Sequence, residues 1–216
     1  MASLFVVAGP NGAGKTTLFE GIIPKGIEYL NTDLIAKDIR EQAGGLNVQD
    51  LANAEASNFF YNKISNRETF AIETNLADID TFKSFIELQK KHGYEIVITY
   101  LTVKDVSICK ERVAQRVKEG GHNVNPDIIQ QRYESSLKLL GFYKSFPDSL
   151  RLLDNSDGKI NVQAELIRGE IKYQNNNLEN WVSSIISSNP LRETQKISSI
   201  EEAKLLYKSK TIKNKF

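Results

Sequence analysis

Residues 9–16 read GPNGAGKT and follow a short apolar stretch, residues 4–8, which reads LFVVA. β-Branched and aromatic residues that end at a Gly-Pro pair are typical of a buried strand that runs into a turn. The octapeptide matches the pattern Gly-x-x-x-x-Gly-Lys-Ser/Thr at every fixed position, and the residues after it are compatible with a helix. Strand, glycine-rich loop and helix in this order predict a P-loop, whose backbone N–H groups bind a polyphosphate at the helix N-terminus.

The loop and the start of the helix are expected to bind ATP. Lys15 is expected to reach the β- and γ-phosphates, and the Thr16 hydroxyl is expected to coordinate Mg²⁺. The nucleotide-binding set comprises Gly9, Pro10, Asn11, Gly12, Ala13, Gly14, Lys15, Thr16 and Thr17. This motif predicts nucleotide binding but leaves open which group receives a phosphate.

The rest of the chain alternates between candidate strands and candidate helices. Further strands are expected at 28–31, 69–73, 95–101 and 150–154. The segments 48–64, 79–92, 105–119 and 126–146 carry apolar residues at helical spacing, and Asn125 before Pro126 is a good helix start. Alternating strands and helices predict an α/β fold of the P-loop NTPase type, with a mostly parallel sheet flanked by helices.

The 216 residues fit a single catalytic domain with additions at its C-terminal side. We expect a P-loop domain over residues 1–188, with a helical lid at about 105–140 and a small β-hairpin at about 162–173 around Arg168-Gly169. Residues 191–216 hold seven Lys or Arg and three Asp or Glu. We therefore expect residues 189–216 to form a basic tail or docking segment.

Composition excludes several classes of protein. With 40% hydrophobic and 25% charged residues the chain is of the globular type, and a net charge of +1 lacks the basic excess of a nucleic-acid-binding face. A single cysteine, Cys109, excludes an intramolecular disulfide and a multi-cysteine zinc site. The apolar start is too short for a signal peptide or a membrane span, so a cytoplasmic protein without membrane association is expected.

Carboxylates follow two of the candidate strands, where a doubly wound sheet forms its binding crevice. Asp33 comes just after residues 28–31 and is the candidate catalytic base, although the spacing also allows it to cap a helix that begins near Leu34. Glu73 ends the strand at 69–73, and Thr74 and Asn75 follow it. All three are candidates for binding the acceptor, and Glu73 is also a candidate for holding Mg²⁺ through water. A buried structural role for Glu73 is the alternative.

Arginines on two helices are candidates for neutralising the transferred phosphate. Arg112 and Arg116 lie four residues apart on one helical face, and Arg132 lies on the next helix. Gly120-Gly121 between the helices provides a joint that would let the pair close as a lid. Solvated arginines in ordinary salt bridges are the alternative. Cys109 falls on an apolar stripe with Val113 and is expected to be a packed, inert thiol.

These residues together resemble the zeta toxin family of P-loop kinases over roughly residues 4–155. The resemblance rests on the P-loop, on Asn31-Thr32-Asp33 and on residues 70–75. The discriminating part is the GGHNVNP segment at 120–126 between Arg112–Arg116 and Arg132-Tyr133.

The resemblance implies an ATP- and Mg²⁺-dependent kinase whose toxin members phosphorylate the sugar of UDP-N-acetylglucosamine. It assigns Asp33 as the catalytic base, Lys15 and Thr16 as phosphate and Mg²⁺ residues, and Arg116 and Arg132 as γ-phosphate arginines. A neutralising antitoxin protein is the partner that such a toxin would have. Two alternatives stay open: a metabolic kinase of the gluconate or shikimate kind, and a non-catalytic module that binds partners when ATP is bound.

Overall fold

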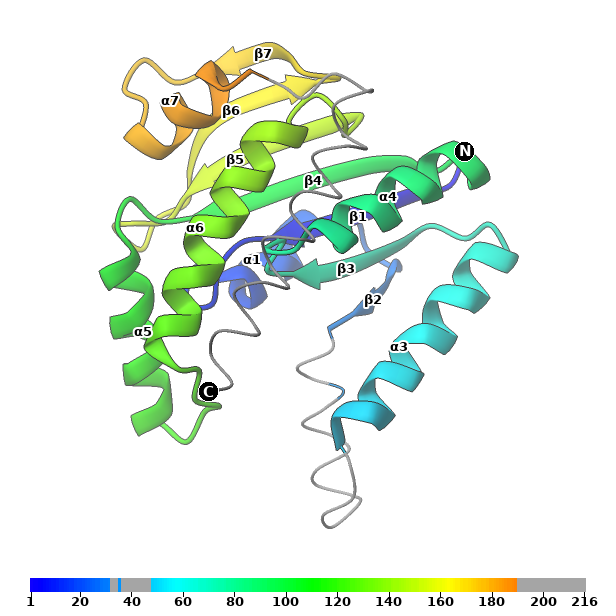
Figure 1. Ribbon diagram of the computed structural model, residues 1–216, viewed down its shortest axis with the longest axis horizontal. Coiled ribbons are helices and arrows are strands. Elements are labelled where there is room, and N and C mark those ends of the chain that lie inside the picture. Colours follow the sequence, from blue (N-terminus) through cyan, green and yellow to red (C-terminus); the bar gives the residue numbers. More distant parts are fainter. Residues whose placement is uncertain (32–34, 36–47, 190–216) are drawn as a thin grey trace, which may run out of the picture.

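The computed structural model describes residues 1–31, 35 and 48–189. One seven-stranded sheet runs through this part of the chain (Figure 1). Its strands are β1 (Ser3–Ala8), β2 (Glu28–Leu30), β3 (Phe70–Thr74), β4 (Glu95–Thr102), β5 (Ser149–Asp154), β6 (Asn161–Ile167) and β7 (Glu170–Gln174). The α/β fold with a mostly parallel sheet, as predicted from the alternation of elements, is confirmed.

The strand order is β2-β3-β1-β4-β5-β6-β7, with β1 in the interior of the sheet. Strands β1 to β5 pair in parallel, so their carboxyl ends lie at the same edge of the sheet. The chain leaves β1 for β2 on one side and later returns to β4 on the other side. Such a reversal of strand order opens a crevice at the carboxyl ends of the strands on either side of it.

The hairpin of β6 and β7 extends the sheet with antiparallel strands. Its turn consists of Arg168 and Gly169, whose φ angles are 49° and 83°. Two central residues with positive φ characterise a type I′ turn, the turn that matches the twist of a hairpin. The structure therefore has a hairpin close to the predicted 162–173.

Helices cover both faces of the sheet. They are α1 (Lys15–Ile22), α3 (Val48–Ser65), α4 (Ile79–His92), α5 (Val106–Lys118), α6 (Pro126–Tyr143) and α7 (Asn180–Ser187). In Figure 1, α4 lies in front of β1 and β4, and α6 crosses the sheet near β5. No helix within the described ranges is both long and apolar enough to cross a membrane.

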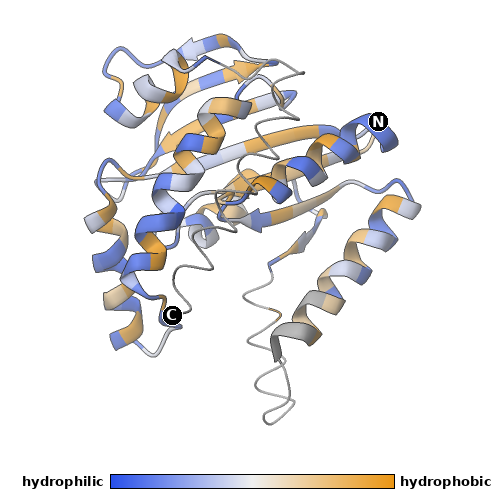
Figure 2. Cartoon of the chain, viewed as in Figure 1, coloured by the Kyte–Doolittle hydropathy of each residue, from blue (hydrophilic) through white to orange (hydrophobic). Residues whose placement is uncertain are grey.

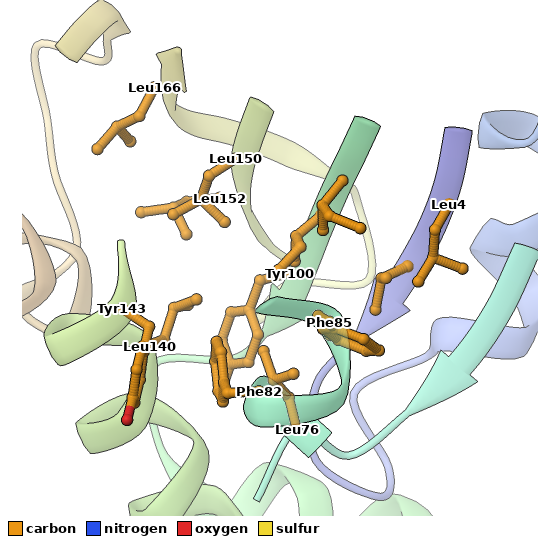
Figure 3. Packing of buried hydrophobic residues seen from close by; sticks show 14 of the residues in the cluster. Leu4, Leu76, Phe82, Phe85, Tyr100, Leu140, Tyr143, Leu150, Leu152 and Leu166 are labelled. Carbon is orange, nitrogen blue, oxygen red and sulfur yellow. The ribbon is translucent and has the colours of Figure 1, made fainter. Parts of the chain in front are cut away.

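The larger core lies between the sheet and the helices α4, α6 and α7. Figure 3 shows its centre, where Phe82 of α4 and Tyr143 of α6 stack with ring centroids 4.7 Å apart near Tyr100 of β4. Successive strand residues point to opposite faces, so Leu101 and Leu153 lie on the other side and pack with Ala13 and residues of α1. Figure 2 shows the same arrangement as apolar strands covered by helices of mixed polarity.

Side-chain caps explain why several helices begin where the sequence predicts. Asp78 accepts the Thr81 N–H, Asp105 accepts the Ser107 N–H and Asn125 accepts the Asp127 N–H. These bonds satisfy N–H groups that the first turn of a helix leaves without an intrahelical partner. The α6 helix ends at Tyr143, three residues before the expected end at 146. At this end Phe146 bonds back to Tyr143 in a tighter i to i−3 pattern.

Candidate nucleotide-binding and phosphoryl-transfer site

The predicted P-loop lies between the carboxyl end of β1 and the start of α1, in the crevice that the strand order creates. Gly9 has φ 142° and Gly12 has φ 83°, backbone conformations that residues other than glycine rarely adopt. A Cβ on Gly9 would lie 1.9 Å from the Leu101 carbonyl oxygen, and one on Gly12 would lie 2.4 Å from the Cys109 carbonyl oxygen. Both backbone shape and neighbouring backbone therefore require glycine here.

Lys15 begins α1 and folds back over the loop. Its side chain is 7% exposed, and Nζ donates a 3.1 Å hydrogen bond to the Pro10 carbonyl oxygen. Nζ also lies 3.5 Å from Asn75 Oδ1 and 3.7 Å from Glu73 Oε1. Gly14 caps α1 without a side-chain hydrogen bond, so no side-chain oxygen of the cap competes with an anion for the helix N-terminus.

Glu73 lies at the centre of a polar cluster beside the P-loop. Its side chain is 11% exposed. Oε2 accepts hydrogen bonds from Thr16 Oγ1 at 3.2 Å, from Tyr29 Oη at 2.8 Å and from Asn31 Nδ2 at 3.0 Å. Parallel pairing of β3 with β1 puts Glu73 beside Val7, just before the loop. The structure thus brings Glu73, Asn75, Lys15 and Thr16 together.

The oxygen atoms of this cluster suit a magnesium ion. Hydroxyl and carboxylate oxygens are the protein ligands that Mg²⁺ takes, usually together with water and substrate phosphates. The Thr16 hydroxyl donates to Glu73, which leaves its oxygen lone pairs directed away from that carboxylate. Within the described ranges no group of three or more His, Cys, Asp or Glu could hold a metal ion by itself. Thr16 and Glu73 therefore fit an ion held mainly by phosphates.

The three candidate arginines occupy different places. Arg132 Nη1 donates a 2.8 Å hydrogen bond to Asn11 Oδ1 and so reaches the P-loop. Arg116 Nη2 donates to the His122 carbonyl oxygen at 3.0 Å, within the joint that follows α5. Arg112 Nη2 donates to the carbonyl oxygens of the loop after β5. Arg112 and Arg116 share a helix but have different hydrogen-bond partners in this structure.

A cavity of about 330 Å³ lies next to the P-loop on the side of Arg112. Its lining includes residues of α1, of α5 and of the loop after β5: Gly14, Thr17, Leu18, Arg112, Asn155, Gly158 and Ile160. Arg112 Nη2 contacts the Asn155 and Ser156 carbonyl oxygens at 2.7 and 3.2 Å. Its Nη1 is buried and has no hydrogen-bond partner among the described residues. Unpaired buried donors are rare in proteins.

This cavity was not expected from the sequence. Asn155 Nδ2 donates a 2.8 Å hydrogen bond to the Ala13 carbonyl oxygen, which ties the loop after β5 to the P-loop. A signal was available, since Asn155 follows the last parallel strand directly and therefore belongs to the carboxyl edge of the sheet. Tyr29 was also missed. Its polar end lies at the Glu73 carboxylate, whereas the sequence pattern indicates only a strand that leads to Asp33.

Asp33, the predicted catalytic base, lies outside the described residues, as do Thr32 and Leu34. The last described residue before this segment is Asn31, whose side chain contacts Glu73. Thr74, a candidate acceptor residue, turns its hydroxyl to the N–H of Leu76 at 3.1 Å. Of the 189–216 tail, only residue 189 is described.

Cys109 packs under the P-loop as an inert thiol, as its place on the apolar stripe predicts. Its side chain is fully buried with Val113 in a small cluster. Burial raises the pKa of the Cys109 thiol to about 11, so the thiolate is scarce near neutral pH. The backbone of Cys109 lies close to Gly12 of the P-loop.

Comparisons with known proteins agree with the P-loop fold. A family model described as an AAA domain matches residues 4–135. An uncharacterized protein of Haemophilus influenzae is 30% identical over 125 residues, which cover 58% of this chain and 88% of the relative.

Two solved structures share the fold at lower identity. The AvrRxo1-ORF1:ORF2 complex with ATP has a TM-score of 0.65 at 18% identity, covering 89% of this chain. This chain spans 65% of that protein. The PezAT toxin-antitoxin system of Streptococcus pneumoniae has a TM-score of 0.55 at 16% identity, covering 94% of this chain and 85% of that one. Since the family model covers more than half of the chain and includes the P-loop, this protein belongs to the AAA domain family.

Proposed function

We propose that this protein is an ATP-dependent kinase that transfers the γ-phosphate to a hydroxyl of a sugar nucleotide, as a zeta-type toxin. The observation that carries the proposal is the convergence on one P-loop of a carboxylate and an arginine from distant parts of the chain. Glu73 accepts from Thr16, and Arg132 donates to Asn11. Binding of the phosphates alone needs no arginine from a distant helix, whereas phosphoryl transfer uses both kinds of group.

The cavity beside Arg112 supports ATP as the donor. It adjoins the P-loop and holds one planar cation, Arg112, that suits stacking on a purine ring. Leu18 and Ile160 provide apolar surface for the other side of a base. A structural neighbour, the AvrRxo1 complex, was solved with ATP. We assign Thr17, Leu18, Arg112 and Ile160 to the base and ribose end of the nucleotide.

The residues around the P-loop have distinct roles in the proposed transfer. The backbone of residues 9–14 and Lys15 bind the β- and γ-phosphates, and Arg132 neutralises charge that spreads over the γ-phosphate oxygens. The chemistry that Mg²⁺ would supply when bound is neutralisation of the phosphate charge. Thr16 and Glu73 would hold it, Thr16 directly and Glu73 through water.

The acceptor side of the reaction is assigned to Asp33, Glu73, Thr74 and Asn75. Asp33 takes the proton of the acceptor hydroxyl while the new oxygen–phosphorus bond forms and the bond to the β,γ-bridging oxygen breaks. Its placement rests on sequence, since it comes two residues after Asn31, which contacts Glu73. Arg116 is assigned to the γ-phosphate on the resemblance alone. For it to reach the phosphate, the α5–α6 lid over residues 105–140 must release the His122 contact.

UDP-N-acetylglucosamine is the first acceptor to test. The support is the resemblance of residues 4–155 to the zeta toxins together with a fold shared with the PezAT toxin-antitoxin system. The proposal includes an antitoxin protein as partner, and both structural neighbours come from two-protein systems. The domain over residues 1–188 would act as the toxin, with residues 189–216 as a basic tail.

The test is a reaction of the purified full chain with ATP, Mg²⁺ and UDP-N-acetylglucosamine, followed by mass spectrometry of the sugar nucleotide. The expected result is a mass gain of one phosphoryl group, reduced by roughly 10²–10⁴ in Asp33→Asn, with ATP affinity nearly unchanged. ADP formation with another hydroxyl metabolite but not with this one would favour the gluconate or shikimate kind of kinase. Tight ATP binding without any acceptor-dependent ADP would favour the binding module.

A growth experiment separates toxin from metabolic kinase. Expression of the wild-type chain is expected to arrest growth, and Lys15→Ala is expected to relieve the arrest because Lys15 contacts the phosphates. Normal growth at matched expression levels would contradict the toxin assignment. It would leave the kinase assignment to be judged by the mass measurement.

A further inference from the structure

Tyr29 connects three elements that meet at the P-loop. It belongs to β2, its ring lies against Phe19 of α1 with ring centroids 3.5 Å apart, and its hydroxyl donates to Glu73 Oε2 at the end of β3. The planes of the two rings are inclined by 33°. The ring contact therefore fixes where the hydroxyl lies relative to the P-loop helix.

Asn31 completes the arrangement from the same strand end. Its Nδ2 atom donates to Glu73 Oε2 at 3.0 Å and to Tyr29 Oη at 2.9 Å, and the residue is only 8% exposed. Tyr29, Asn31 and Glu73 thus form a closed triangle of hydrogen bonds. These three bonds are partly buried, so breaking one of them costs free energy.

The donors approach one oxygen of the carboxylate. Thr16, Tyr29 and Asn31 all donate to Oε2, while Oε1 lies 3.7 Å from the Lys15 ammonium. Two of the three donors come from β2 and the residue after it, and only one comes from the P-loop. Without Tyr29 and Asn31 the carboxylate would be free to rotate about its last bond toward Lys15, because a free carboxylate torsion is broad. Thr16 would then lose its acceptor.

We infer that Tyr29 and Asn31 are positioning residues that hold the Glu73 carboxylate on Thr16 and so make nucleotide binding respond to Mg²⁺. This inference rests on the proposed function, because it takes Thr16 and Glu73 as the residues that hold the ion. Neither residue touches the transferred phosphate in this assignment. Both act through Glu73 on the hydroxyl that coordinates the metal.

Binding of a non-hydrolysable ATP analogue, measured by calorimetry with excess Mg²⁺ and with EDTA, tests the inference without any need for an acceptor. We expect Mg²⁺ to raise the affinity of the wild-type chain. Tyr29→Phe, which keeps the ring on Phe19, is expected to reduce that gain about three- to tenfold, a size typical of one ordinary hydrogen bond. Its affinity in EDTA should equal that of the wild type.

Two further variants show whether the effect passes through Glu73. Glu73→Gln should lose the Mg²⁺-dependent gain, and adding Tyr29→Phe to it should cause no further loss, since the hydroxyl then has no carboxylate to orient. Asn31→Ala should reduce the gain as well, because it removes the other donor from β2 and the residue after it that holds Glu73 Oε2. Tyr61→Phe, on an exposed side chain of α3, is the matched control and should bind as the wild type does.

The outcomes separate the two proposals. A wild-type chain that binds the analogue with a Mg²⁺-dependent gain, together with an unchanged gain in Tyr29→Phe, would overturn the role of Tyr29 and leave the kinase assignment intact. Additive losses in the double variant would also overturn it, because Tyr29 would then act apart from Glu73. A folded wild-type chain that binds no analogue at all would overturn both proposals.

Discussion

Arg132 in the second turn of α6 donates a 2.8 Å hydrogen bond to Asn11 in the P-loop, although the two residues are 121 positions apart. Asn11 is 6% exposed, so the guanidinium is held at the inner surface of the loop. Asn11 is a variable position of the P-loop pattern and here serves as the anchor of an arginine. The α5–α6 pair is therefore already connected to the nucleotide site.

Replacing Arg132 tests whether this arginine acts on the transferred phosphate. Arg132→Ala should lower the rate of phosphoryl transfer by about 10³, the lower range for an arginine that stabilises the transition state. Substrate affinities should change far less. Lys138→Ala removes a positive charge from the exposed face of the same helix and serves as the control. Equal rates for the two variants would show that Arg132 contributes only general charge.

We expect Arg112 to bind the base of the nucleotide rather than its phosphates. Arg112→Leu should weaken ATP binding by about tenfold, whereas the affinity for inorganic triphosphate should stay the same. Calorimetry with both ligands separates the contribution of the base to the binding free energy from that of the phosphates. Lys118→Ala, which removes an exposed cation from the same helix, should affect neither ligand. A parallel loss of triphosphate affinity in Arg112→Leu would place this guanidinium on the phosphates instead.

The fold was predictable because its signals are local. A P-loop pattern at residues 9–16 fixes the strand before it and the helix after it, and apolar periodicity gives the other elements to within a few residues. The type I′ turn at Arg168-Gly169 required only its glycine and the flanking strands. Strand order was not predictable from such signals, since β1 pairs with β3 and β4 rather than with its sequence neighbour β2.

The site was predictable only in part, for the same reason. The P-loop follows β1 directly and Glu73 lies near the end of β3, so their place at the carboxyl edge could be expected. Arg112 and Arg116 donate hydrogen bonds to carbonyl oxygens of two different loops, and helical spacing cannot reveal these partners. Tyr29 reaches Glu73 across 44 positions of sequence, and this contact forms only because β2 pairs with β3.

Substitution of Gly9 should cost more stability than substitution of a glycine that only needs positive φ, because another part of the backbone lies close to Gly9. Gly9→Ala should lower the free energy of unfolding by about 3 kcal/mol or more, because Cβ would overlap the Leu101 carbonyl oxygen and the backbone would be strained. Gly26 has φ 86°, and a Cβ added there would meet nothing within 4 Å, so Gly26→Ala should cost only about 1–2 kcal/mol. Urea unfolding of both variants measures the difference. Equal losses would contradict the close contact.

Alkaline pH should destabilise the fold through its buried tyrosines. Burial raises the pKa of Tyr100 far above its ordinary value of 10.0, and its hydroxyl lies 2.7 Å from Ser136 Oγ. Because the folded-state pKa is the higher one, the stabilisation is complete below pH 10 and is lost as the pH rises above it. Each such tyrosine lowers the free energy of unfolding by up to about 1.4 kcal/mol per pH unit in this range.

Tyr100→Phe should flatten this alkaline loss when unfolding free energies are compared between about pH 9 and pH 11. The exposed Tyr61 provides the control, since Tyr61→Phe should follow the wild-type slope. Burial also raises the pKa of Tyr94, Tyr133 and Tyr143, so part of the slope should persist in Tyr100→Phe. A slope unchanged by Tyr100→Phe would show that this hydroxyl ionises equally in both states.

The central claim, that the P-loop of this chain transfers a phosphoryl group to a hydroxyl, is tested most directly by following the γ-phosphate itself. The purified full chain is incubated with Mg²⁺ and γ-labelled ATP in a metabolite extract containing UDP-N-acetylglucosamine. We predict label in a phosphorylated sugar nucleotide and no labelled product with Lys15→Ala. Label found only as inorganic phosphate, or retained in ATP by a chain that binds it, would contradict the kinase assignment.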